Sequence, residues 1–152
     1  MKHNFRQLQA VDGMTSLDKN YVKRLIADIE EAMEIVLEDL SKPFNSISRA
    51  EKSEVRYYLI VMVEALVALC YHLSRRAYNI TPGSSIEAFK VLMDRGLLTS
   101  EEFDDFAKLA RLRNLLVHRY WIIDDRRIYY EVKKNFKHVK NFIEKIRRVL
   151  SV

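Results

Sequence analysis

The feature that most constrains the fold is a long apolar segment near the middle of the chain. Between Leu59 and Leu73, apolar residues occupy nearly every side of the helix that this segment would form, and Glu64 is its one acidic residue. A helix that is apolar on nearly all sides has to be buried inside a protein. The whole helix is expected from about Ala50 to Tyr78. The sequence therefore predicts a central core helix around which the other elements pack.

The rest of the chain also favours helices. Its 152 residues include 3 Gly and 2 Pro, and this scarcity of turn residues favours long helices over many short strands. Apolar residues at helical spacing and capping residues predict four further helices, at about 18–40, 84–96, 99–117 and 124–150. The expected fold is all-α, an up-and-down bundle of about five helices. Because the central helix needs so much cover, we also expect a second copy of the chain, in a two-fold homodimer.

The length allows one domain with a core of its own. Residues 14–152 are expected to form a single helical domain, and residues 1–13 resemble a leader or a flexible arm. The N-terminus lacks the apolar core of a signal peptide, and the apolar run at 57–71 is shorter than the roughly 20 residues that a bilayer requires. We therefore expect a cytoplasmic protein without a membrane partner.

The single cysteine limits the chemistry further. Cys70 lies inside the apolar segment, where a buried, unreactive thiol is expected. One cysteine allows no disulfide within the chain and no cysteine-based metal site. We expect neither a metal nor another cofactor.

The positive charge is concentrated near the C-terminus. The net charge is +5, and the segment from Arg126 to Arg148 holds nine basic residues against two acids. Such a segment can attract a polyphosphate over a long range. It is also typical of a solvated helix face, and composition alone leaves both interpretations open.

The residues best suited to catalysis or ligand binding lie at the end of the helix expected at 99–117. Arg113 falls within an apolar stripe formed by Phe106, Leu109, Leu112 and Leu116. An arginine in such a stripe costs stability unless it is paired or used. Glu64 of the central helix is the candidate partner, as a buried carboxylate. Asn114 and His118 lie on roughly the opposite side of the same helix.

These residue types suit a phosphate ester. Histidine can accept and donate protons near neutral pH, and the planar fork of arginine binds two phosphate oxygens. Positions 113 and 118 differ by about 140° around a helix and by about 7.5 Å along it, so one helix does not readily place both groups on one phosphate. Two copies of the chain can bring them together. The alternatives are a simple ion pair for Arg113, a cation at a helix C-terminus for His118, and core or interface packing for Tyr120 and Trp121.

The run Arg113-Asn114-x3-His118-x-Tyr120-Trp121 resembles the HEPN superfamily, and within it the HepT-like branch, over roughly residues 20–150. This resemblance implies a metal-independent endoribonuclease whose two motif helices face each other across a dimer cleft. Arg113 and His118 would be catalytic. Asn114, Tyr120 and Glu64 would support them.

The resemblance also implies a partner. HepT-like members are toxins of type VII-like toxin–antitoxin pairs, neutralised by a minimal nucleotidyltransferase (MNT) antitoxin that in some pairs transfers AMP to the motif tyrosine, here Tyr120. The alternative is a helical dimer that binds a nucleotide or RNA and partners or regulates a nucleotidyltransferase without cutting anything. A purely architectural dimer would leave Arg113 in its apolar stripe poorly explained.

Overall fold

Apolar stripes and well-placed caps produce five α-helices in residues 17–152, the part of the chain that the computed structural model describes. The elements are α2 (Lys19–Asp39), the 3-10 turn η2 (Phe44–Ser46), α3 (Arg49–Tyr78), α4 (Ser85–Asp94), α5 (Ser100–His118), the 3-10 turn η3 (Tyr120–Ile122) and α6 (Asp125–Leu150). The five predicted helices are confirmed, and so is the all-α class. The expectation for residues 1–13 lies outside the described residues.

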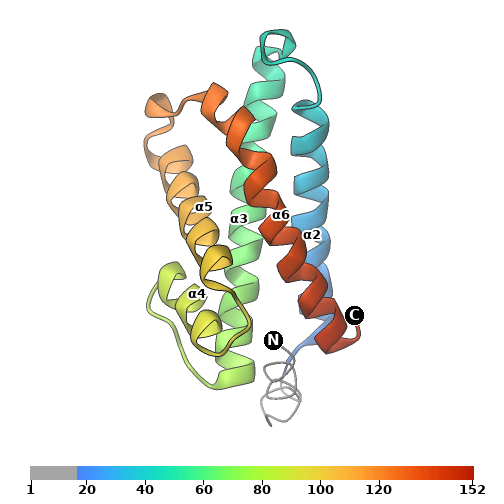
Figure 1. Cartoon of the computed structure of the whole chain (residues 1–152), viewed down its shortest axis with the longest axis vertical. Coiled ribbons are helices and arrows are strands. Elements are labelled where there is room, and N and C mark those ends of the chain that lie inside the picture. Colours follow the sequence, from blue (N-terminus) through green and yellow to red (C-terminus); the bar gives the residue numbers. More distant parts are fainter. Residues whose placement is uncertain (1–16) are drawn as a thin grey trace.

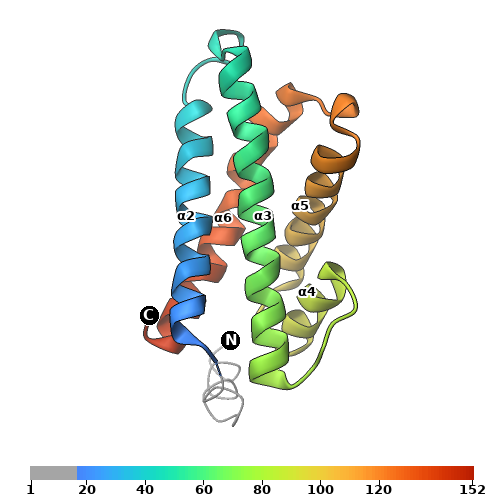
Figure 2. The same cartoon turned by 180° about the vertical axis from the view of Figure 1, so that it is seen from behind.

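The helices follow an up-and-down course around α3 (Figure 1). α2 runs antiparallel beside α3, α6 crosses the pair on one side, and α5 flanks α3 with the short α4 at its base. Seen from behind, α3 lies in front and no other helix covers it (Figure 2). The core therefore lies between the α2–α3 pair and the layer formed by α5 and α6.

Three phenylalanine rings join the helices on the core side of α3. Phe106 of α5 makes edge-to-face contacts with Phe89 of α4 and Phe142 of α6, at centroid separations of 5.5 and 5.4 Å. All three side chains are fully buried. Such pairs stabilise a core beyond the area that they bury. Cys70 is also fully buried, and burial raises the pKa of its thiol, as expected for an unreactive cysteine.

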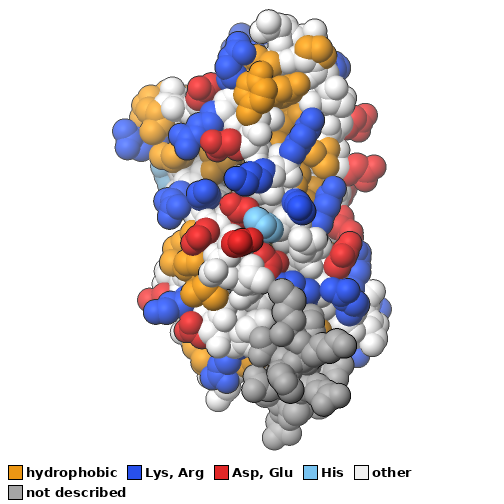
Figure 3. All heavy atoms as spheres, viewed as in Figure 1, with side chains coloured by type: hydrophobic (Ala, Val, Ile, Leu, Met, Phe, Trp, Pro, Cys, Tyr) orange, Lys and Arg blue, Asp and Glu red, His pale blue; other side chains and the backbone are white. Residues whose placement is uncertain are grey.

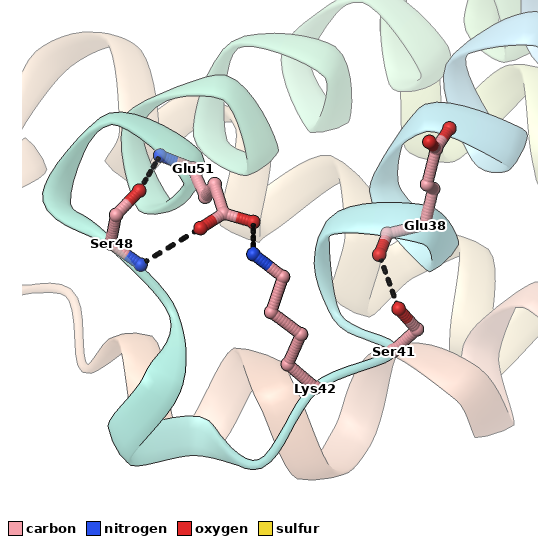
Figure 4. A network of polar contacts seen from close by, with 5 residues as sticks. All are labelled: Glu38, Ser41, Lys42, Ser48 and Glu51. Atoms are coloured by element: carbon pink, nitrogen blue, oxygen red, sulfur yellow. Dashed lines mark hydrogen bonds and ion pairs between the residues drawn. The ribbon is translucent and has the colours of Figure 1, made fainter.

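The turn from α2 to α3 is fixed by polar contacts (Figure 4). The Ser48 hydroxyl accepts the backbone N–H of Glu51, and the Glu51 carboxylate accepts the backbone N–H of Ser48, which makes a capping box at the start of α3. Lys42 donates to the same carboxylate at 2.6 Å. The ion pair with Lys42 and the bonds from Ser48 lower the pKa of Glu51 to about 2. At the other end, α3 stops at Asn79, which adopts the left-handed conformation.

The central helix is only half covered. One face of α3 is fully buried, while Tyr57 on the other face is 60% exposed and further apolar side chains there are only partly buried, among them Ile60, Val61, Ala68 and Tyr71. By length and composition α3 could cross a membrane, contrary to the expectation from the run at 57–71, yet half of its most apolar window is buried within the bundle. We call these five side chains the apolar α3 face.

Candidate active site

α5 carries the predicted motif, and both of its ends are well defined. Its first turn is held by a capping box between Thr99 and Glu102. The preceding turn contains Gly96 at φ 78°, the left-handed position expected for a glycine after a helix. α5 ends at His118 because Arg119 leaves the helical conformation, with φ −142° and ψ 44°. His118 is thus the last helical residue, and Tyr120 and Trp121 follow in η3.

Arg113 forms the ion pair that the sequence predicted. Its Nη2 donates to Oε1 of Glu64 at 2.8 Å, and its Nη1 donates to Oδ1 of Asn114 at 3.1 Å. The expectation of a buried carboxylate was wrong, because the Glu64 side chain is 54% exposed and that of Arg113 is 30% exposed. No other described helix lies over the outward side of α3 (Figure 2), which agrees with the exposure of the Glu64 side chain. An exposed pair of this kind contributes at most about 1 kcal/mol to stability, so the contact orients the guanidinium more than it stabilises the fold.

Arg113 and Asn114 border a recess of about 290 Å³ between α3 and α5, lined also by Val63, Glu64, Val67, Ala68, Ser85 and Ala110. Its walls are mainly apolar, with the Arg113–Glu64 pair and the Asn114 amide as polar groups. A guanidinium at the rim of such a recess can bind a phosphate and still reach solvent.

His118, Tyr120 and Trp121 are all on the surface. Tyr120 is 60% exposed and Trp121 is 67% exposed, and their rings meet edge to face at 5.4 Å. The core interpretation of these aromatics is therefore wrong, and the interface interpretation stays a prediction. No hydrogen bond or ion pair within residues 17–152 engages the His118 ring. The alternative interpretation of His118, as a favourable cation at a helix C-terminus, therefore also stays a prediction.

A single copy of the chain keeps the two predicted catalytic groups apart. The guanidinium of Arg113 points to Glu64 on α3, whereas His118 lies at the exposed end of α5. No hydrogen bond or ion pair in the described part of the chain joins them. This arrangement agrees with the angular separation expected from helix geometry.

Arg56 is a residue of this region that the sequence analysis missed. From α3 its guanidinium reaches the segment that follows the motif helix and donates to the Asp125 carboxylate and to the backbone oxygens of Tyr120 and Ile123. Arg56 is a cation close to the apolar segment of α3, and that was the available signal. Its partners, more than 60 residues away, have no local signature.

The basic segment from Arg126 to Arg148 is divided by the fold. Lys145 pairs with Glu102, Arg147 pairs with Glu30, and Arg127 pairs with Glu131. Arg126 lies over the ring of Phe44 at 4.5 Å. The exposed basic residues of α6 without such a contact are Lys133, Lys134, Lys137, Lys140 and Arg148. The interpretation as a solvated helix face fits these five residues, and the attraction of a polyphosphate stays a prediction.

The described residues contain no group of three or more His, Cys, Asp or Glu side chains that could hold a metal ion. The other two histidines of this range have structural partners. His72 accepts the backbone N–H of Asp18 at 3.1 Å, and His138 contacts the buried Asp105.

The fold and the site together define a class: an all-α bundle whose fourth α-helix ends in Arg-x4-His and is followed by an exposed tyrosine and tryptophan. The chain belongs to the ribonuclease HepT-like family, whose model matches residues 22–146. The resemblance expected from the motif is thereby confirmed.

Two curated relatives carry ribonuclease names. The chain is 27% identical over 84 residues to the mRNA nuclease HepT of Shewanella oneidensis and 30% identical over 69 residues to the putative RNase YutE of Bacillus subtilis. These matches take in 55% and 45% of this chain. They span 63% and 48% of the two relatives, less than two thirds of either.

Solved structures share the fold. A crystal structure of a toxin–antitoxin with AMP-PNP aligns at a TM-score of 0.76 and 21% identity, over 85% of this chain and 98% of that one. The tri-AMPylated Shewanella oneidensis HEPN toxin in complex with MNT antitoxin aligns at a TM-score of 0.77 and 22% identity, over 84% of this chain and 97% of that one. The cytosolic protein YutE from Bacillus subtilis aligns at a TM-score of 0.75 and 18% identity, over 88% of this chain and 91% of that one.

Proposed function

We propose that this chain is a metal-independent endoribonuclease toxin of a type VII-like toxin–antitoxin system, acting in the cytoplasm. The observation that carries the proposal is the arrangement around α5. A guanidinium held by Glu64 and Asn114 borders an open recess. The imidazole of His118, which has no partner within residues 17–152, ends the same helix, and the exposed Tyr120 follows it. The family and the ribonuclease names of its relatives support this assignment.

The proposed reaction uses the ribose 2′-hydroxyl as an internal nucleophile. One His118 takes the 2′-hydroxyl proton as the O2′–phosphorus bond forms. The bond from phosphorus to the 5′-oxygen breaks, and that oxygen is protonated by a second imidazole. The products are a 2′,3′-cyclic phosphate and a free 5′-hydroxyl. Arg113 neutralises the charge that gathers on the phosphate oxygens, and Asn114 and Glu64 hold its fork in place.

A second copy of the chain would supply the second imidazole. The apolar α3 face lies beside the recess and is not covered by any other described helix (Figure 2). Contiguous apolar surface of this kind marks a site of association. Pairing through this face about a two-fold axis would set two copies of Arg113 and His118 around one cleft. A variant that stays monomeric and cuts RNA at the full rate would contradict this part of the proposal.

The proposed regulator is an MNT-family nucleotidyltransferase, the partner of the solved HEPN toxin complex. The Tyr120 hydroxyl would attack the α-phosphorus of ATP, forming the Oη–phosphorus bond and releasing pyrophosphate, while its proton passes to a base on the partner. The bound AMP would place negative charge and bulk where the RNA phosphate has to enter. The exposure of Tyr120 leaves its ring accessible for this transfer.

His118→Ala tests the nuclease directly. We expect cleavage of a labelled single-stranded oligoribonucleotide, measured with EDTA present, to fall by about 10²–10⁴-fold, because a positioned proton-transfer group contributes that much. The helical circular dichroism and the RNA affinity should be retained. Lys108→Ala is the matched control, since Lys108 is an exposed cation on the same helix. If the unmodified protein binds this RNA but never cuts it, the non-catalytic binding dimer is correct instead.

Co-expression with an MNT partner tests the regulator. The intact mass of the chain should rise in steps of one AMP, and Tyr120→Phe should abolish the first step. A chain that keeps its unmodified mass in the presence of a partner with demonstrated AMP-transfer activity would overturn the AMPylation proposal and leave the nuclease proposal intact.

A further inference from the structure

The segment that carries Tyr120 has little apolar anchorage. η3 contains no buried residue, and Tyr120, Trp121 and Ile122 are 60, 67 and 49% exposed. Of the residues between α5 and α6, Ile123 packs partly against the core. Two hydrogen bonds close the turn itself, from the N–H of Ile122 to the Arg119 oxygen at 3.1 Å and from the N–H of Ile123 to the Tyr120 oxygen at 3.3 Å. Packing alone does not fix this segment.

Arg56 supplies what packing does not. Its Nη1 donates to the backbone oxygen of Tyr120 at 2.8 Å, its Nη2 to that of Ile123 at 3.2 Å, and its Nε to Oδ1 of Asp125 at 2.7 Å. All three guanidinium nitrogens therefore bind the same short segment, on both sides of Trp121. Arg56 itself stands on α3, the helix that also carries Glu64.

The geometry suits a rigid connection. Hydrogen bonds from a charged donor are about twice as strong as neutral ones, and the planar fork holds its acceptors in a fixed relation. The Arg56 and Asp125 side chains are 24 and 30% exposed, so solvent competes with them only in part. Asp125 is also the first residue of α6. Arg56 thus ties the segment both to α3 and to the start of α6.

From these contacts we infer that Arg56 is a positioning residue for Tyr120, holding its backbone so that the hydroxyl is presented at a fixed place beside the Arg113 and His118 site. This inference rests on the proposed role of Tyr120 as the acceptor of AMP. Each of the three guanidinium nitrogens of Arg56 donates to this segment, so we infer that Arg56 acts through the segment that it binds. The same connection sets where a transferred AMP group would lie relative to Arg113.

The consequence for function is kinetic. A displacement of about 1 Å in a reacting group can lower a rate by about 100-fold even when the change lies away from the chemistry. Arg56→Ala should therefore lower kcat for AMP transfer to Tyr120 by about 10- to 100-fold, with KM for ATP unchanged, because ATP binds to the partner. Arg56→Lys keeps the charge without the planar fork, and its kcat for AMP transfer should lie between those of the unmodified protein and Arg56→Ala. Arg75→Ala, at the exposed opposite end of α3, is the matched control.

Trp121 gives a second readout, which requires neither RNA cleavage nor AMP transfer. It is the one tryptophan in the chain and lies within the segment that Arg56 binds. Time-resolved fluorescence anisotropy should show faster local motion of Trp121 in Arg56→Ala and, to a smaller extent, in Asp125→Asn. The helical circular dichroism and the thermal midpoint should change little, since η3 contributes no buried side chain.

The outcomes separate the two proposals. Unchanged Trp121 motion in a folded Arg56→Ala protein overturns the positioning role. Faster Trp121 motion with a normal kcat for AMP transfer overturns its importance for Tyr120. Should the unmodified chain accept no AMP while Trp121 responds as expected, the proposed regulation fails and the structural connection stands. If Arg56→Ala does not fold, the anisotropy comparison is made with Arg56→Lys and Asp125→Asn, and the same criteria apply.

Discussion

The two halves of α5 differ in the burial and pairing of their key charged side chains. In the first half, Glu102 and Asp105 are 3 and 5% exposed, and each has a partner on α6: Lys145 at 2.5 Å from Glu102, and His138 against Asp105. In the second half, Arg113 has a partner that is itself exposed, and His118 has none among the described residues.

This difference shows which charges serve the fold and which are available for chemistry. A buried carboxylate without a partner costs several kcal/mol, so the pairs of the first half are required by burial itself. An exposed pair contributes at most about 1 kcal/mol and leaves its groups free to meet a ligand. Space-filling representation shows the pale blue of a histidine among red acidic side chains on the α6 side of the bundle (Figure 3). The pairs of Asp105 with His138 and of Glu102 with Lys145 are part of the structure more than of a site.

Breaking the first half should have the largest effect. Lys145→Ala leaves the carboxylate of Glu102 buried and unpaired, and we expect the free energy of unfolding to fall by about 3–5 kcal/mol, measured by urea denaturation. Cleavage of RNA below the melting temperature should persist, because this pair lies far along α5 from His118. Lys140→Ala, which removes an exposed cation from the same helix, controls for loss of charge. A change under about 1 kcal/mol in Lys145→Ala would erase the contrast between the halves.

Breaking the second half should affect activity instead. Arg113→Ala should lower the rate of RNA cleavage by about 10²–10³-fold, the usual cost of removing one group that stabilises transition-state charge. The free energy of unfolding should change by no more than about 1 kcal/mol, because the pair with Glu64 is exposed. Glu64→Gln, which keeps shape and removes charge, should give a smaller loss of cleavage at unchanged stability. Strong destabilisation by Arg113→Ala would mean that this half also serves the fold.

A pH series on Asp39 sharpens the comparison with an acid that has no basic partner among residues 17–152. Burial, together with the neighbouring Glu54 carboxylate, raises the pKa of Asp39 from 3.8 to about 6. The folded protein therefore binds this proton more tightly than the unfolded chain, and the resulting stability is present below about pH 4 and lost as the pH rises through about 6. Asp39→Asn should raise the melting temperature at pH 7 and flatten its dependence between pH 4 and 6. An unchanged pH profile in the variant would contradict this assignment.

Sequence patterns predicted the helices well, since helix formation here is a local matter. The apolar stripes and the caps at Ser84, Thr99 and Asp124 lie within a few residues of the ends that they define. The pair between Arg113 and Glu64 was also predictable, because Arg113 is a charge in an apolar stripe and Glu64 is a charge in an apolar helix segment. The exposure of Glu64 was not, since it depends on which face of α3 the other helices leave open.

Contacts between distant segments were beyond the sequence. Arg56 binds backbone oxygens, and a backbone oxygen has no signature in the amino-acid order. Nothing near His138 in the sequence indicates its partner. It contacts Asp105, 33 residues away, because α5 and α6 pack together. In both cases the arrangement of the helices decides the partner. Patterns within one helix could not supply it.

The burial of Cys70 makes the molecule convenient for probing by thiol chemistry. No other cysteine occurs in the chain, and this one is hidden from solvent with its thiolate form disfavoured. Labels and cross-linkers applied to the folded protein would therefore react only where a cysteine has been introduced. Tyr57→Cys or Ala68→Cys could then report, through a disulfide between copies or a distance between spin labels, whether and how two α3 helices meet.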